Sequence, residues 1–161
     1  MVREAAGQRR LFLTFVERDV PLAQPLVSEL RHDHSLTVDF SLVGDRFDTV
    51  GAHYIRSSLA QRVGRSSAVL CLLGEETLRD PWVTWALGVA YELGRRVLAV
   101  PLLPTAQDPA PLVGQLDAVV VPPRTALIVA ELRAHPERER RDLQRDRLAV
   151  LAERMPSLHI K

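Results

Sequence analysis

The sequence predicts an α/β domain, a three-layer sandwich in which a five-stranded parallel sheet lies between two layers of helices. Short apolar runs of strand length alternate with segments of helical periodicity along most of the chain. The helical segments that separate the runs are about 10 to 15 residues long, as in βαβ units. A length of 161 residues fits one compact domain better than two.

The five expected strands are the apolar runs of the chain. The third run, "SAVLCLLG", is the most apolar, which is typical of a strand covered on both faces. The second run alternates in character, and the fifth is the weakest. The runs comprise residues 10–16, 36–42, 67–74, 95–103 and 117–122.

Helices are expected between the strands and at the end of the chain. The first covers residues 19–33, with Asp19 as its N-cap and Pro21 in its first turn. The second covers residues 52–66. The third begins after Asp80 and carries two tryptophans on its apolar side.

The sequence divides into an extension at residues 1–8, the α/β domain at 9–130 and a charged segment at 131–161. In the last segment acids and arginines interleave at helix-neighbour spacing. We expect a charged C-terminal helix that packs on the domain or extends it.

Composition excludes several classes of partner. With 21 basic and 20 acidic residues, the net charge is +1, so neither nucleic acid nor a membrane is expected as a partner. The single cysteine, Cys71, fits a reducing compartment, and no signal sequence begins the chain, so we expect a cytoplasmic protein. The five histidines lack metal-ligand spacing, and no metal site is expected.

Ligands of open parallel sheets bind beyond the carboxyl ends of the strands. This rule directs attention to residues 14–19, 39–45 and 74–82. None of these segments contains a Gly-x-Gly-x-x-Gly or a P-loop motif, so neither a standard dinucleotide-binding nor a kinase-like site is supported.

Residues 9–122 resemble the TIR-like domains of bacterial anti-phage defence, most closely those of the Thoeris type. The most specific part is the spacing Gly-x-x-Thr-x-x-x-x-Trp-Val, which begins at Gly74 and includes Thr77 and Trp82. The second is Asp-x-Ser-Leu, which begins at Asp39.

The resemblance implies a flavodoxin-like fold with a site for NAD at the strand ends. Active members cleave the bond between nicotinamide and ribose, and they release nicotinamide and a cyclic or conjugated ADP-ribose that activates a partner effector. NAD is thus a substrate, and no cofactor is implied. The other partners implied are the effector, reached through the product, and further copies of the chain.

The resemblance also implies a set of nucleotide-binding residues. They come from the ends of the first three strands, from the loop after the second strand and from the tryptophan helix. The expected binding residues are Phe15, Val16, Glu17, Asp39, Ser41, Asp45, Arg46, Gly74, Glu75 and Trp82.

The catalytic position is the most informative residue of the resemblance. Active members carry a glutamate in the motif Trp-Val-x-x-Glu, but here the fifth position of this motif is Ala86. We expect this position to lie in the first helical turn and to face a polar cleft. A carboxylate there would stabilise positive charge on the ribose, so the sequence as it stands is expected to be almost inactive.

Three explanations of Ala86 stay open. The alanine is an inactivating substitution, or the chain is a natural pseudoenzyme that binds nucleotide or protein partners as a scaffold, or another acid serves. Glu75 and Glu76 are better placed for that role than Glu92, because six helical positions turn a side chain well away from the face of residue 86.

Overall fold

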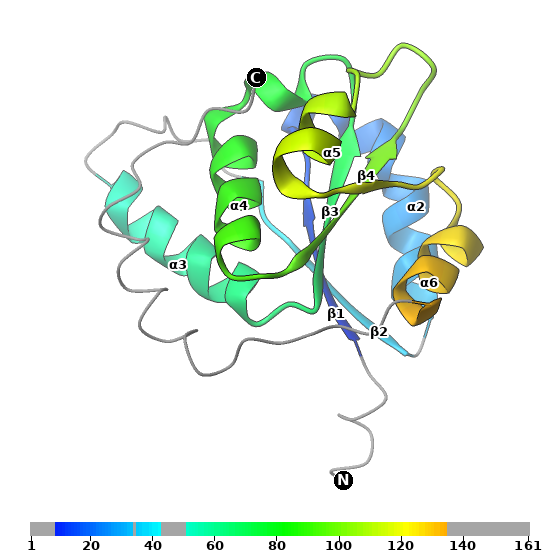
Figure 1. The fold of residues 1–161 in the computed structure, drawn as a ribbon, viewed down its shortest axis with the longest axis horizontal. Coiled ribbons are helices and arrows are strands. Elements are labelled where there is room, and N and C mark those ends of the chain that lie inside the picture. The colour runs from blue at the N-terminus through cyan, green and yellow to red at the C-terminus, as the bar shows by residue number, and fades with distance from the viewer. Residues whose placement is uncertain (1–8, 34, 43–50, 135–161) are drawn as a thin grey trace, which may run out of the picture.

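The computed structural model describes residues 9–33, 35–42 and 51–134, and these form one parallel sheet covered by helices on both faces (Figure 1). The strand order is β2-β1-β3-β4-β5 and every neighbouring pair is parallel. The predicted fold class is therefore confirmed. The strands are β1 (Arg9–Thr14), β2 (Leu36–Phe40), β3 (Ala68–Leu73), β4 (Arg96–Pro101) and β5 (Val119–Val120).

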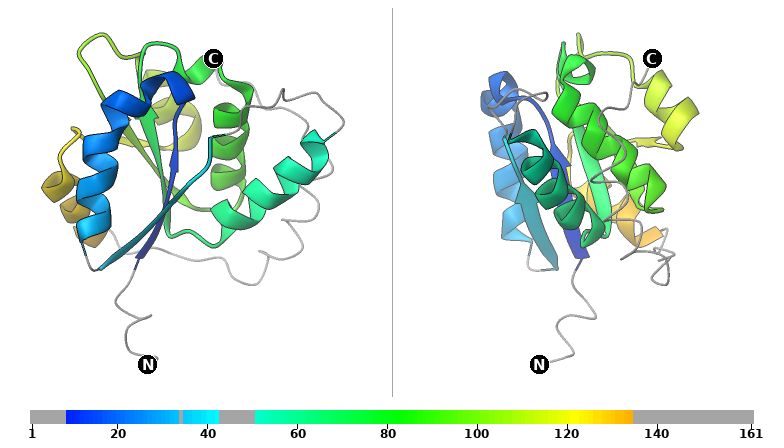
Figure 2. Two further views of the ribbon diagram at one scale, coloured as in Figure 1. Left: turned by 180° about the vertical axis from the view of Figure 1, so that it is seen from behind. Right: turned by 90° about the vertical axis from the view of Figure 1, so that its left-hand side faces the viewer.

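The helices divide between the two faces of the sheet. Helices α3, α4 and α5 cover one face, and α2 and α6 cover the other (Figures 1 and 2). Their bounds are α2 (Val20–His32), α3 (Ala52–Gly64), α4 (Pro81–Glu92), α5 (Ala110–Leu116) and α6 (Thr125–Ala134). Two short 3-10 turns, η1 (Glu17–Asp19) and η2 (Thr77–Arg79), lie just before α2 and α4.

The side chains of the central strands alternate between two apolar cores. Phe12 and Cys71 belong to the core under α3 and α4, whereas Leu11, Leu13 and Leu70 belong to the core under α2 and α6. This alternation follows from the two-residue period of a strand. Because both faces are covered, every residue of β3 is buried, as the apolar run predicts.

Helix α4 is the most deeply buried helix of the described chain. Its residues from Trp82 to Ala90 are all buried, and the indole of Trp85 is fully enclosed. The helix begins with Asp80 as N-cap and Pro81 at its first position, both favourable at a helix start. Asp80 accepts hydrogen bonds from the backbone N–H of Trp82 at 2.8 Å and of Val83 at 3.3 Å.

Several details differ from the sequence-based expectations. Helix α5 was not expected, because its seven residues include a proline and a glycine and show little periodicity. β5 has only two residues, and β1 ends at Thr14 rather than at residue 16. Helix α6 begins at Thr125 and continues across residue 130. The extension at 1–8 and the charged residues 135–161 lie outside the described residues.

None of the helices in the described part of the chain combines the length and apolarity needed to cross a bilayer.

Candidate functional site

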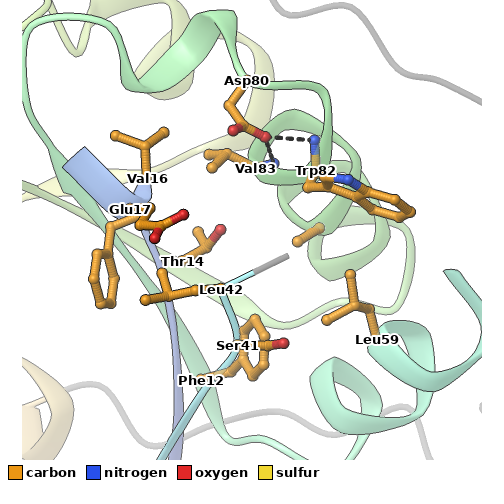
Figure 3. A pocket seen from close by; sticks show the side chains of 12 residues that line it. Phe12, Thr14, Val16, Glu17, Ser41, Leu42, Leu59, Asp80, Trp82 and Val83 are labelled. Carbon is orange, nitrogen blue, oxygen red and sulfur yellow. Dashed lines mark hydrogen bonds between the residues drawn. The ribbon is translucent and has the colours of Figure 1, made fainter. Parts of the chain in front are cut away.

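A pocket of about 170 Å³ lies beyond the carboxyl ends of β1 and β2, against the first half of α4 (Figure 3). Its walls come from the end of β1, the β1–α2 loop, the residues after β2, helix α3 and the start of α4. The lining residues are Phe12, Thr14, Phe15, Val16, Glu17, Ser41, Leu42, Leu59, Asp80, Trp82, Val83 and Ala86.

The lining of this pocket is acidic and aromatic. Its ionisable groups among the described residues are two carboxylates, Glu17 and Asp80, and no arginine, lysine or histidine lines it. Three aromatic rings, the hydroxyls of Thr14 and Ser41 and several aliphatic side chains form the rest of the surface. Such a lining favours a flat, positively charged group over a phosphate.

The β1–α2 loop is fixed to the β3–α4 turn by two contacts. Arg18 forms an ion pair with Glu76 at 3.1 Å on the surface. Beneath it, the buried carboxylate of Asp19 accepts a long hydrogen bond of 3.5 Å from the hydroxyl of Thr77, which itself accepts a bond of 2.6 Å from the N–H of Gly74. The exposed ion pair contributes little, so the buried contact is the main attachment.

Gly74 is required by the position of Asp19. A Cβ built on Gly74 would overlap the Asp19 carboxylate, so only glycine allows the loop to approach the turn this closely. Asp19 was expected to cap α2, but its side chain makes no capping hydrogen bond. The carboxylate instead lies against the glycine of the motif that begins at residue 74.

Burial raises the pKa of the Asp19 carboxyl above its ordinary value of 3.8. The charge of Arg18 and the hydrogen bond from Thr77 lower this pKa, and the nearby acids Glu75 and Glu76 raise it further. Desolvation is the largest of these effects, because it penalises the charged form of a carboxyl.

Ala86 lines the pocket, but not in the way that the sequence suggests. It is the sixth residue of α4, so it lies in the second turn rather than the first, and it is only 2% exposed. It belongs to the same apolar core as Phe12 and Leu59. The expectation of a position facing a polar cleft was therefore wrong: this part of the pocket wall is apolar.

The structure brings together six of the eleven residues expected at the site. They come from the β1–α2 loop, the end of β2 and helix α4, and they are Phe15, Val16, Glu17, Ser41, Trp82 and Ala86. Asp45 and Arg46 lie outside the described residues.

Three of the expected residues lie elsewhere among the described residues. Both carboxylate oxygens of Asp39 accept hydrogen bonds from Arg62, one of them at 2.9 Å. Gly74 lies against Asp19, as described above. The carboxylate of Glu75 accepts a hydrogen bond of 2.6 Å from the hydroxyl of Thr105.

Six lining residues were not among those expected. Thr14 and Asp80 lie inside the strand-end segments that the sequence did indicate, so a wider selection there would have included them. Phe12 and Leu59 have the apolar character of core residues, and nothing in their sequence context distinguishes them from core. Leu42 and Val83 complete the six.

Among the described residues, no group of three or more His, Cys, Asp or Glu side chains is arranged to hold a metal ion.

We predict that Gly74→Ala destabilises the fold by about 1–3 kcal/mol, because the added methyl overlaps the Asp19 carboxylate. Urea unfolding measures this change. Gly114→Ala is the matched control, since Gly114 has open space around it within α5, and its free energy of unfolding should stay the same or rise slightly. In an Asp19→Ala background, Gly74→Ala should lower the free energy of unfolding clearly less. An equal loss in both backgrounds would contradict the close contact between Asp19 and Gly74, which we call the clamp together with the hydrogen bonds of Thr77.

The raised pKa of Asp19 predicts a pH effect of defined sign. Between pH 3.8 and the higher pKa in the folded state, the native protein binds more protons than the unfolded chain, so this group stabilises the fold as pH falls. Asp19→Asn removes that contribution. The free energy of unfolding of the variant, minus that of the unmodified chain, should increase from about pH 4 upward and then level off. A difference independent of pH would show that Asp19 has an ordinary pKa.

The family model described as "Thoeris protein ThsB, TIR-like domain" matches residues 13–107, which is more than half of the chain. The search of curated proteins found no match.

Solved structures that are similar to this one include the following two. The Clostridium botulinum CMP N-glycosidase BcmB has a TM-score of 0.50 at 8% identity, with 78% of this chain and 99% of that chain covered. The TIR domains of the activated Roq1 resistosome that recognises the effector XopQ have a TM-score of 0.45 at 16% identity, covering 92% of this chain and 86% of that chain. At these identities the first likeness concerns the fold alone, and the second is too distant to add to it.

The family match includes β3, the clamp at Gly74 and Thr77, and the whole of α4, so it contains much of the pocket wall. The chain belongs to the family of the TIR-like domain of Thoeris protein ThsB.

Proposed function

We propose that the pocket binds the nicotinamide end of NAD and that the chain is a nucleotide-processing component of anti-phage defence. The observation that carries the proposal is the convergence of six expected site residues on one acidic, aromatic pocket. The family membership supports the defence role. Under this proposal an active form releases nicotinamide and an ADP-ribose product, cyclic or conjugated, that signals to a partner effector.

The size and lining of the pocket agree with one end of a dinucleotide. Its volume of about 170 Å³ is below the ~300–1,000 Å³ typical of sites that enclose a drug-sized ligand. The pyridinium ring of NAD is flat and positively charged, and the aromatic walls and carboxylates suit it. The phosphates would have to lie outside this pocket, because no basic side chain of the described chain lines it.

The chemistry of cleavage explains the importance of residue 86. When the bond between nicotinamide and ribose breaks, the electron pair leaves with the ring nitrogen and positive charge develops on the ribose. A carboxylate close to the ribose stabilises this charge. A methyl group at Ala86 offers no such stabilisation, so the chain as it stands should bind NAD without efficient cleavage.

A second candidate function is a nucleotide-binding scaffold that acts through contacts with proteins. The observation that favours it is the apolar, almost fully buried surrounding of Ala86. An apolar surrounding of this kind suits an alanine side chain, as expected for a protein that binds a nucleotide without cleaving it.

We predict that the unmodified chain binds NAD and releases little nicotinamide. Calorimetric titration measures the binding, and chromatography of the same mixture measures free nicotinamide. The loss of a charge-stabilising carboxylate typically lowers a rate by about hundreds-fold. Trp82→Ala should weaken binding because it removes an aromatic wall of the pocket. Glu29→Gln, on the surface of α2, is the control and should bind normally. Absence of binding by the unmodified chain would refute the proposed function.

We predict that Ala86→Glu gives the chain measurable nicotinamide release. The new side chain must enter a buried, apolar wall, so the variant should also be less stable than the unmodified chain. Ala86→Gln is the matched control, because it has nearly the same shape and lacks the charge. Release should rise about a hundredfold or more for the glutamate variant over the glutamine variant.

Equal release by the two variants, with both shown to be folded and to bind NAD, would contradict the enzyme proposal. The scaffold function would then be the better account.

A further inference from the structure

We infer that Glu17 is the acid of this pocket: its carboxylate supplies the negative charge that faces a cationic ligand and makes the pocket prefer oxidised NAD to NADH. The inference rests on the proposed function and deepens it. It follows from the position of each acid near the strand ends and from the bonds that each acid makes.

The acids that the sequence offered as substitutes do not line the pocket. Glu75 accepts a hydrogen bond from Thr105 at 2.6 Å, and Glu76 is paired with Arg18 at 3.1 Å. Glu92 is the last residue of α4, at the opposite end of the helix from Asp80. None of these three glutamates therefore contributes its charge to this pocket.

Two carboxylates do line the pocket, and one of them, that of Asp80, already accepts hydrogen bonds within the protein. One oxygen of Asp80 accepts hydrogen bonds from the backbone N–H groups of Trp82 and Val83. Its charge is therefore balanced by the positive end of α4. The carboxylate of Glu17 makes no hydrogen bond and no ion pair within the described part of the chain. Glu17 is the acid whose charge is available to a ligand.

The backbone that carries Glu17 is held in place. Glu17 begins the short turn η1, and the next two residues, Arg18 and Asp19, are the two that attach this loop to the β3–α4 turn. Figure 3 shows Thr14, Val16 and Glu17 on one side of the pocket and the start of α4 on the other. These contacts fix the backbone position of Glu17 at the edge of the pocket, while its side chain is exposed.

A carboxylate at this position acts on charge alone. During cleavage the C–N bond between ribose and nicotinamide breaks, the electron pair leaves with neutral nicotinamide, and a water or hydroxyl group adds to the ribose carbon and loses a proton. Glu17 forms no bond in this scheme; its charge faces the positively charged pyridinium of the bound ligand. The charge that develops on the ribose still lacks the carboxylate that is missing at residue 86. The charge of Glu17 should make the pocket prefer oxidised NAD to NADH, whose dihydropyridine ring is neutral.

The test compares the affinities of oxidised NAD and NADH by calorimetric titration. Glu17→Gln should lower the affinity for oxidised NAD by about tenfold, as expected for one charge contact in a partly solvated site, and change that for NADH less than twofold. Glu17→Asp keeps the charge and should retain most of the preference. Glu29→Gln, which removes an acid from the surface of α2, should leave both affinities unchanged.

The outcomes separate the inference from the proposed function. If the unmodified chain binds neither dinucleotide, the proposed function fails and the inference with it. If the chain binds oxidised NAD but Glu17→Gln lowers both affinities alike, or neither, the inference alone is overturned. If Glu17→Asp lowered the affinity for oxidised NAD as much as Glu17→Gln does, the inference would also be overturned, because the shape of the side chain and not its charge would then decide binding.

Discussion

The contact between the Asp19 carboxylate and the backbone at Gly74 is the constraint on which the pocket depends. Without a side chain at residue 74, the β1–α2 loop can lie directly on the β3–α4 turn. The first segment carries Val16 and Glu17, and the second leads into Asp80 and α4. Thr77 completes the contact by accepting from Gly74 and donating to Asp19. The contact therefore fixes the position of the β1–α2 loop relative to the start of α4, and these two segments, distant in sequence, form two walls of the pocket.

The burial of α4 explains why a carboxylate at residue 86 and a carboxylate at Glu17 would differ in their effect on stability. α4 packs against the sheet, α3 and α5, so its residues from Trp82 to Ala90 have almost no contact with solvent. A carboxylate on such a helix must be desolvated, at a cost in stability that a ligand or a partner charge has to offset. The Glu17 carboxylate, by contrast, is exposed on the β1–α2 loop and bears no such cost. Glu17 is therefore compatible with a stable fold in the absence of ligand.

The sequence predicts the fold better than it predicts the site, and the reasons are physical. Apolar runs such as "SAVLCLLG" are visible because a strand buried on both faces must be apolar along its whole length. Helix α5 has no comparable signal, because its seven residues are too few for a clear period. The strand-end rule selected the segments that contain Phe15 and Ser41, which both line the pocket, since parallel strands present their carboxyl ends at one edge. It could not show that Asp39 is bound by Arg62, because that pairing depends on the position of α3.

The same limit explains the errors at Asp19 and Ala86. An aspartate before a helix is normally a cap, and only the approach of a distant glycine gives this one another partner. Position 86 was expected to be polar because of its place in a motif, whereas its surroundings are set by Phe12 on β1 and Leu59 on α3. A motif records which residue types recur at a spacing, but the polarity around each residue comes from other segments. An acid that gives the pocket its charge has to be sought among the residues that line the pocket. In this chain that criterion selects an acid in the loop after β1, nearly seventy residues before position 86 in the sequence.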